Sequence, residues 1–305
     1  MALGALLLML TQLPALTITS AFVMGLIGSY TVVIVPAALA DHHGSKRAIE
    51  LTESNVAASL STVLVPLLIG FGEASGLGWR VGLVAGIVWL GLLAVFFRGT
   101  AVPAGEPRRD AEVKRPLPRR FWAYWLVIML GVALEWSIVF WGADFLEKSV
   151  GLEKVTSATL MSIFFLAMVI GRVIGSRLTR TIESSRLLVY AIAVVGVGFP
   201  LFWLSPLPVL NVLGLFLAGL GIANLFPLTL AVATSIDPSQ ANAASGRISI
   251  ASGIAILVVP QILGSFADQV GIFNAFGVAA VLLIAAALIV FAERRFKAVQ
   301  AAQSR

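Results

Sequence analysis

The sequence predicts an all-α integral membrane protein with about ten transmembrane helices. Hydrophobic residues make up 59% of its 305 residues and charged residues only 12%, whereas a soluble domain is about half apolar and about a quarter charged. The mean hydropathy is +0.99. The apolar residues lie in about ten runs. A helix of roughly 18 apolar residues is long enough to cross the hydrocarbon layer, so each run is a candidate transmembrane helix. We expect helices because a backbone in lipid must satisfy its own hydrogen bonds, and because the short alternating segments of a membrane β-barrel are missing.

Four of these apolar runs lie in the first part of the chain and six in the second. The first four span Leu3–Thr17, Thr19–Ala40, Glu53–Phe71 and Val81–Phe97. The next stretch is rich in proline and charge, which predicts a flexible linker over residues 99–120. The later six runs span Phe121–Phe145, Thr156–Leu178, Leu187–Leu204, Val209–Thr234, Ile248–Phe266 and Phe273–Phe291. The sequence therefore predicts a helical region at residues 1–98, the linker, and a six-helix region with a basic tail at residues 121–305.

The basic residues predict the orientation of these helices. If the linker is cytoplasmic, alternation of the spans places all 21 basic residues on the cytoplasmic side except Arg80, Lys148 and Lys154. Cytoplasmic loops of membrane proteins carry an excess of lysine and arginine. We therefore expect a multi-pass protein of the cytoplasmic membrane, with its linker and C-terminus in the cytoplasm.

Several function classes are excluded by composition. The net charge is +6, but the basic residues flank the spans and form no basic and aromatic soluble face, so we expect no nucleic-acid partner. The chain has no cysteine, and its two histidines, His42 and His43, are adjacent in one loop. No span contains a histidine or a facing pair of aspartates, and no P-loop is present. We expect no enzyme activity, no catalytic residues, no metal and no cofactor.

An internal repeat links the two parts of the chain. Leu64–Gly70 reads LVPLLIG and Val258–Gly264 reads VVPQILG, at an offset of 194 residues. The same offset pairs Gly25 with Gly219 one helix earlier and Trp79 with Phe273 at the next helix start. Internal repeats of this kind are typical of secondary transporters.

The repeat also predicts that the first part is incomplete. Subtracting the offset from Leu187, where the third span of the second region begins, gives a position before Met1. Two helices of the first region would then precede Met1. We expect an N-terminally truncated protein, a start placed too late, or a degenerate copy.

Two stretches resemble a known family. Gly171–Arg180, GRVIGSRLTR, resembles the Gly- and Arg-rich loop between helices 8 and 9 of the major facilitator superfamily (MFS), although the aspartate of that loop is absent and Ser176 stands near its place. Gly131–Leu146 resembles the seventh helix of the branch that includes fucose–proton symporters. The resemblance implies an MFS-type bundle in which residues 1–98 are the equivalents of helices 3–6. It further implies that the spans Thr19–Ala40, Phe121–Phe145 and Val209–Thr234 line a central cavity.

The charged residue that stands out inside a span is Glu135. Ionisable side chains within the membrane are costly, by about 2.5–3.5 kcal/mol on insertion scales, and usually mark function or a buried partner. A carboxylic acid removed from water can bind and release a proton near neutral pH. We expect Glu135 to bind the coupling proton or the substrate, with a structural carboxylate as the alternative, and Trp136 beside it to contact the substrate.

Other polar residues are candidates for the transport path or a gate. Tyr30, Asn224 and Gln261 lie in spans that line or flank the implied cavity, where each can bind substrate or join neighbouring helices. Arg172 and Arg177 are candidates for a cytoplasmic gate, with simple membrane anchoring as the alternative. Glu53 and Arg247 are related by the repeat offset and can form a gate pair or face water.

These observations predict a secondary active transporter that moves a small solute by alternating access, with protons as the coupling ion. Its expected partners are the small-molecule substrate and the lipid bilayer, and we expect a monomer. One alternative is a ten-helix drug/metabolite-type exporter, which the position of the linker after the fourth span disfavours. The other is a truncated membrane protein that does not transport.

Overall fold

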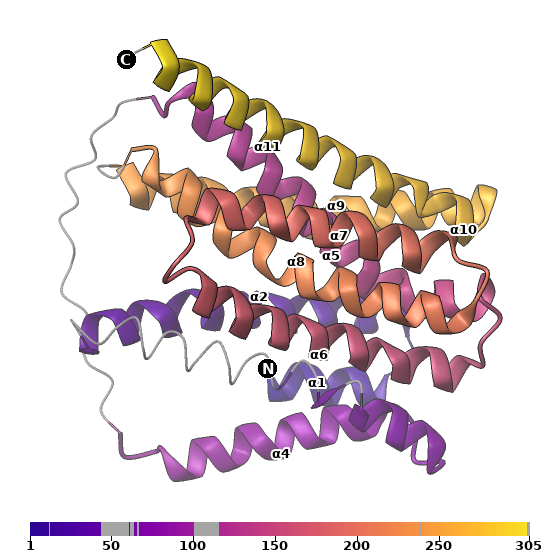
Figure 1. Cartoon of the computed structure of the whole chain (residues 1–305). Coiled ribbons are helices and arrows are strands. Elements are labelled where there is room, and N and C mark those ends of the chain that lie inside the picture. Colours follow the sequence, from indigo (N-terminus) through magenta and orange to yellow (C-terminus); the bar gives the residue numbers. More distant parts are fainter. Residues whose placement is uncertain are drawn as a thin grey trace. The chain divides into compact units, whose positions relative to one another are not determined.

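The computed structural model describes residues 1–11, 13–43, 61, 64–65, 67–100, 116–237 and 240–303. These residues form helices joined by turns, and none of them lies in a β-strand. The chain divides into two compact units, Met1–Ala111 and Glu112–Arg305. Each unit is considered by itself (Figure 1).

The first unit contains helices α1 (Ala2–Leu10), α2 (Pro14–His43) and α4 (Arg80–Phe96). Helix α1 packs against α2 and α4. It approaches α2 closely at Gly4, where an added Cβ would lie 2.7 Å from Cγ of Met24. The Nε–H group of Arg80, at the start of α4, donates a hydrogen bond of 3.1 Å to the carbonyl of Met9. These contacts join the three helices.

The prediction of one span over Leu3–Thr17 is wrong. Helix α1 ends at Leu10, Thr11 is extended with ψ of 144°, and α2 begins at Pro14. Proline lacks a backbone N–H, so it is tolerated in the first turn of a helix but interrupts the interior. The nine residues of α1 rise only about 14 Å at 1.5 Å per residue, which is too short to cross a bilayer.

The other predicted spans of the first unit are partly described. Two apolar helices of intermediate length lie at Pro14–Gly28 and Arg80–Phe96. Helical turns cover residues 67–74, but most of the predicted span Glu53–Phe71 lies outside the described residues, as does most of the predicted linker. The turn before α4 contains Gly76 and Gly78 with φ of +76° and +77°, a backbone conformation that favours glycine.

The second unit contains six helical segments that are long and apolar enough to cross a membrane. They are formed by α5 (Arg119–Lys148), α6 (Lys154–Leu178), α7 (Ser184–Leu204), α8 (Pro208–Ser235), α9 (Ala241–Val270), and the short α10 (Ile272–Ala275) with α11 (Gly277–Gln303). Figure 1 shows these helices running side by side along one direction. The six spans predicted after the linker correspond to them one by one.

Helix α8 lies at the centre of this bundle because small residues let two neighbours approach it. A Cβ added at Gly214 would lie 2.1 Å from the backbone nitrogen of Phe202 in α7, and one added at Gly198 would lie 2.4 Å from that of Ala218. On the other side, a Cβ at Gly171 of α6 would lie 2.5 Å from the carbonyl of Leu220. Small residues at helix interfaces permit such contacts in membranes, where dispersion and hydrogen bonds drive association.

Two tryptophan side chains of α5 attach α9 to the bundle. The indole N–H of Trp141 donates to the carbonyl of Pro260 at 2.8 Å, and that of Trp125 donates to the carbonyl of Arg247 at 2.9 Å. The Trp141 ring lies directly on Gly264, where an added Cβ would be 2.4 Å from Cζ2 of the ring. The proline and glycine of the repeated motif VVPQILG thus form the surface on which this ring packs.

Aromatic rings fill the end of the bundle where α5 finishes. Phe145, Phe199, Phe202 and Phe276 are almost fully buried, and their ring centroids lie 4.8–6.4 Å apart where they pair. Pairs of aromatic rings at such separations stabilise a core beyond simple burial. The buried amide of Asn211 donates to the carbonyl of Phe202 at 2.7 Å and closes the end of α7.

Replacing Gly198 by alanine tests the tight contact between α7 and α8. The added methyl would overlap backbone atoms of α8, and overpacking of this kind costs about 1–3 kcal/mol. We expect G198A to lower the melting temperature of the detergent-solubilised protein. Gly196 is the matched control, because a Cβ added there, two residues earlier in the same helix, meets no atom within 4 Å among the described residues. Equal melting temperatures for G198A and G196A would contradict the contact.

Candidate functional site

Glu135 lies near the middle of α5. It is half-buried between Leu134 and Ser137, which are almost fully buried. It follows Arg119, the first residue of the helix, by about 24 Å of helical rise. Helix α5 begins earlier and ends later than the predicted span Phe121–Phe145, and Glu135 lies close to the midpoint of both. No hydrogen bond or ion pair within 4 Å joins its carboxylate to another described residue.

Among the described residues, the guanidinium of Arg172 in the neighbouring helix α6 lies near enough to favour the ionised form of Glu135 electrostatically, without forming an ion pair with it. Arg172 lies inside α6, six residues before its last residue, Leu178. Its side chain is exposed at the surface of the unit. The sequence predicts different roles for these two residues, Glu135 in the proton site and Arg172 in the cytoplasmic gate. Arg172 also lies within the predicted span Thr156–Leu178. It is therefore an intramembrane charge like Glu135, and the same reasoning marks it as a candidate functional residue.

Trp136 is also half-buried, and its ring lies 5.5 Å from that of Phe140 one turn later. Glu135 directly precedes Trp136, so a carboxylate and a pair of aromatic rings lie close in sequence on the middle of α5. The role of Trp136 in substrate contact stays a prediction.

Asn224 joins α8 to α6. Its Nδ2 group donates to the carbonyls of Gly171 at 2.9 Å and of Leu220 at 3.2 Å. Its Oδ1 lies against Gly175, where an added Cβ would be only 1.8 Å away. The two glycines of the GRVIG stretch therefore accommodate the Asn224 side chain, and its amide hydrogens are used between helices. This geometry supports the interhelical alternative for Asn224.

Three of the remaining candidates lie on helices other than α5. Gln261 is exposed on α9, where it lines a surface depression of about 570 Å³ with apolar residues of the same helix and with Ser265 and Gln269. Arg177 is exposed in the last turn of α6, and Arg247 is exposed near the start of α9. Tyr30 belongs to α2, but its side chain is outside the described part of the structure, as is all of Glu53. The proposed pairing of Glu53 with Arg247 therefore stays a prediction.

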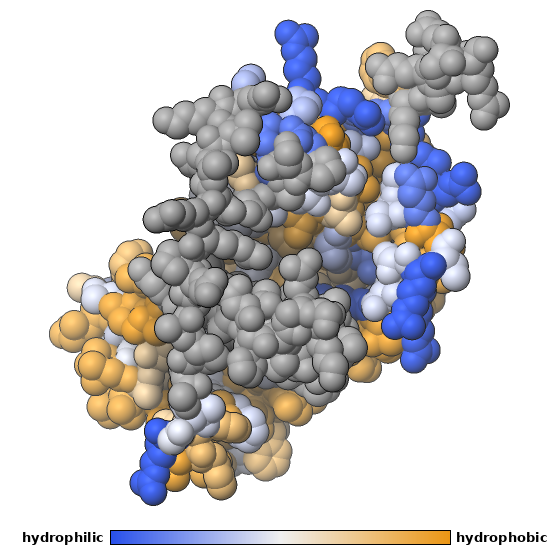
Figure 2. Space-filling model, turned by 90° about the vertical axis from the view of Figure 1, so that its left-hand side faces the viewer, coloured by the Kyte–Doolittle hydropathy of each residue, from blue (hydrophilic) through white to orange (hydrophobic). Residues whose placement is uncertain are grey.

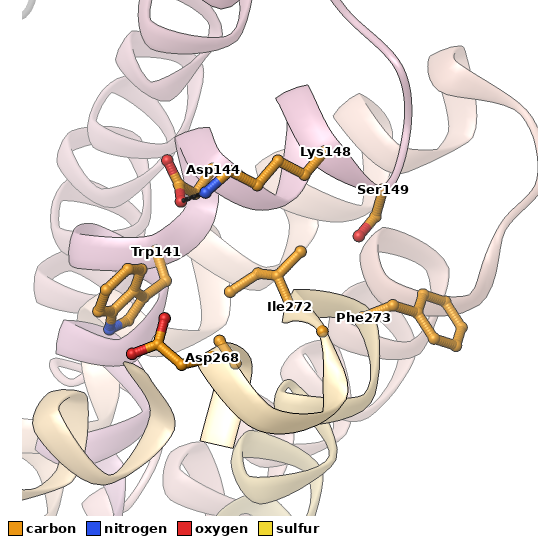
Figure 3. A pocket seen from close by; sticks show the side chains of 9 residues that line it. Trp141, Asp144, Lys148, Ser149, Asp268, Ile272 and Phe273 are labelled. Carbon is orange, nitrogen blue, oxygen red and sulfur yellow. Dashed lines mark hydrogen bonds and ion pairs between the residues drawn. The ribbon is translucent and has the colours of Figure 1, made fainter. Parts of the chain in front are cut away.

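A pocket of about 430 Å³ opens where α5 ends and α9 meets α10 (Figure 3). Lys148 and Asp144 form an ion pair of 2.6 Å on its wall, and Trp141, Asp268 and Ile272 point towards it. This charged wall was not among the predicted site residues, because charges at a helix end usually face water. Within the described residues, no group of three or more His, Asp or Glu side chains could hold a metal ion.

Comparison with known proteins connects this bundle to one family. The model of the Major Facilitator Superfamily matches residues 1–240. An uncharacterised MFS-type transporter of Yersinia pestis is 24% identical over 259 residues, which are 76% of this chain and 67% of that protein. The membrane protein MosC of Rhizobium meliloti is 28% identical over 134 residues, which are 43% of this chain and 33% of that protein.

Solved structures agree with the fold. A bacterial homologue of the human lysosomal transporter Spinster, in an inward-facing and occupied conformation, aligns with a TM-score of 0.57 over 86% of this chain and 73% of its own. Its unoccupied inward-facing form gives the same TM-score. At 15% identity these structures show the fold alone.

The predicted family and the all-α MFS-type bundle are confirmed, and the drug/metabolite-type alternative is wrong. The six membrane-length segments and the transporter relatives make this a multi-pass membrane protein and support membrane transport as its activity. The family model covers most of the described helices in both units. The chain therefore belongs to the Major Facilitator Superfamily.

Proposed function

We propose that the protein is a secondary active transporter that moves a small solute by alternating access, with protons as the coupling ion. The observation that carries this proposal is the position of Glu135, a carboxylate in the middle of a membrane-length helix, acted on by the charge of Arg172. An ionisable group at this depth is a functional site by default. Residues 1–98 then correspond to helices 3–6 of the family, and residues 121–305 to its C-terminal half.

The proposed coupling acts through the charge of Glu135. When the carboxylate is ionised it attracts Arg172 across the interface of α5 and α6, and when it binds a proton this attraction is lost. Opposite charges interact more strongly in a low-dielectric interior than in water. Proton binding therefore changes the force between two helices of the bundle, while water and solute reach Glu135 from the half-buried side of α5. Trp136, Tyr30 and Gln261 are the proposed solute contacts.

The proposed setting is the cytoplasmic membrane, with the linker and C-terminus in the cytoplasm. This orientation follows from the basic residues, of which only Arg80, Lys148 and Lys154 fall on the other side. The proposed cytoplasmic gate contains Arg172 and Arg177, together with Glu53 and Arg247. We expect the protein to work as a monomer within the bilayer, with no nucleic-acid partner.

Replacing Glu135 by glutamine tests whether this residue couples proton movement to solute movement. In proteoliposomes screened with a panel of small solutes, the unaltered protein is expected to accumulate its solute when a proton gradient is imposed. E135Q keeps the shape of the side chain but cannot ionise, so gradient-driven accumulation is expected to fall at least tenfold while exchange without a gradient persists. The exposed Glu153 supplies the matched control, E153Q, which leaves accumulation unchanged. Full accumulation by E135Q would refute the proton site, and failure of the unaltered protein to transport any solute would favour a non-transporting membrane protein.

A double-mutant cycle tests the link between Glu135 and Arg172. If the two groups act as a pair, the loss in E135Q/R172Q is expected to equal that of the worse single variant, because interacting residues are not additive. Initial rates of gradient-driven uptake measure this. R186Q removes an exposed arginine at the start of α7 and serves as the charge control. Losses that multiply in the double variant would show that the two residues act independently.

A further inference from the structure

Helix α11 carries an apolar stripe on its outer surface that ends in arginine. Val281, Ile284, Leu288 and Phe291 are 48–64% exposed. Their spacing of three and four residues places them on one face of the helix, and Arg295 continues that face one turn later. The four apolar residues cover about 15 Å of helical rise, roughly half of the ~30 Å hydrocarbon layer.

The acidic residue of α11 is paired on the side of the helix away from this stripe. Glu293 is the only acidic residue of α11. Its Oε2 accepts a hydrogen bond of 2.9 Å from Nε of Arg120 in α5, and its side chain is only 16% exposed. The hydroxyl of buried Tyr124 lies beside the same Arg120 guanidinium. The ion pair faces inward, on the side of α11 opposite the stripe. The negative charge of Glu293 is therefore balanced by Arg120 and is not available to the arginines that follow it.

The neighbouring arginines keep their charge available. Arg294 and Arg295 are exposed, and neither forms an ion pair with another residue in the described part of the structure. Figure 2 views the molecule from the end where α5 begins and α11 finishes, and hydrophilic residues gather there next to hydrophobic ones. Exposed Trp122, in the first turn of α5, lies at the same end of the bundle, and tryptophan is enriched where membrane meets water.

We infer that this corner of the second unit is a binding site for an anionic phospholipid. The acyl chains lie along Val281, Ile284, Leu288 and Phe291, and the phosphate of the headgroup is held by the guanidinium groups of Arg294 and Arg295. Arginine suits this role because its planar fork can donate two parallel hydrogen bonds to phosphate oxygens. A soluble phosphate would use the arginines alone, whereas the apolar stripe that leads to them fits a ligand with a hydrocarbon tail. This inference does not depend on transport activity.

Thermal unfolding of the full chain in a neutral detergent tests the site. Dioleoyl-phosphatidylglycerol is expected to raise the melting temperature of the unaltered protein, whereas dioleoyl-phosphatidylcholine and inorganic phosphate leave it nearly unchanged. The variant R294Q/R295Q is expected to lose at least half of the phosphatidylglycerol shift. The matched control R180Q/R186Q removes two exposed arginines near the loop between α6 and α7 and is expected to keep the full shift.

Three results would overturn the inference. The first is a full phosphatidylglycerol shift in R294Q/R295Q. The second is an equal loss in R180Q/R186Q, which would mean that any exposed arginine pair suffices. The third is a shift of the same size with inorganic phosphate, which would make the ligand a free anion. If R294Q/R295Q unfolds in detergent, the single variant R295Q and native mass spectrometry, counting bound phosphatidylglycerol, give the same comparison.

Discussion

The close approach of α8 to α6 and α7 is the contact on which the six-helix unit depends. Lipid tails are as apolar as leucine, so helices in a membrane associate through van der Waals contact and hydrogen bonds and not through the hydrophobic effect. Gly171 and Gly175 bring α6 against α8, where Asn224 donates to the carbonyl of Gly171. This contact fixes the rotation of α6 about its axis. It thereby fixes the side of α6 on which Arg172 lies, and the charge that acts on Glu135.

The repeated sequence motif gains a physical meaning from the structure. In the second unit, Gly264 leaves room for the ring of Trp141, and the carbonyl of Pro260 accepts its indole hydrogen. Pro260 and Gly264 of the motif therefore hold the helix that also carries Glu135, whereas Gln261 of the same motif is exposed and stays a proposed solute contact. The counterpart of Pro260 at Pro66 lies outside the described residues. A similar packing site for an aromatic ring in the first unit is expected from the repeat offset alone. A repeat in sequence here reflects how helices are held together.

Hydropathy alone predicted the helices of the second unit, because each of its spans is bounded by charge, proline or glycine. Hydropathy wrongly predicted one helix across Pro14, because the residues on both sides of that proline are apolar and hydropathy does not mark the end of α1. The electrostatic effect of Arg172 on Glu135 and the hydrogen bond of Asn224 with Gly171 act between different helices, and no periodicity within one helix specifies them. For this reason the sequence alone did not decide whether Asn224 binds substrate or joins neighbouring helices. The neutralisation of Glu293 by Arg120, across 173 residues of sequence, was equally inaccessible.

Proton coupling through Glu135 requires that water reaches it from the half-buried side of α5, and cysteine labelling tests this most directly. The chain contains no cysteine, so single-cysteine variants need no background substitutions. In reconstituted protein, E135C is expected to react with a charged, membrane-impermeant thiol reagent added to both sides. S137C, at a fully buried position of the same helix, and V281C, on the outward stripe of α11, are expected to stay unlabelled. Labelling of E135C no faster than that of S137C or V281C would contradict a water-accessible carboxylate and the transport mechanism built on it.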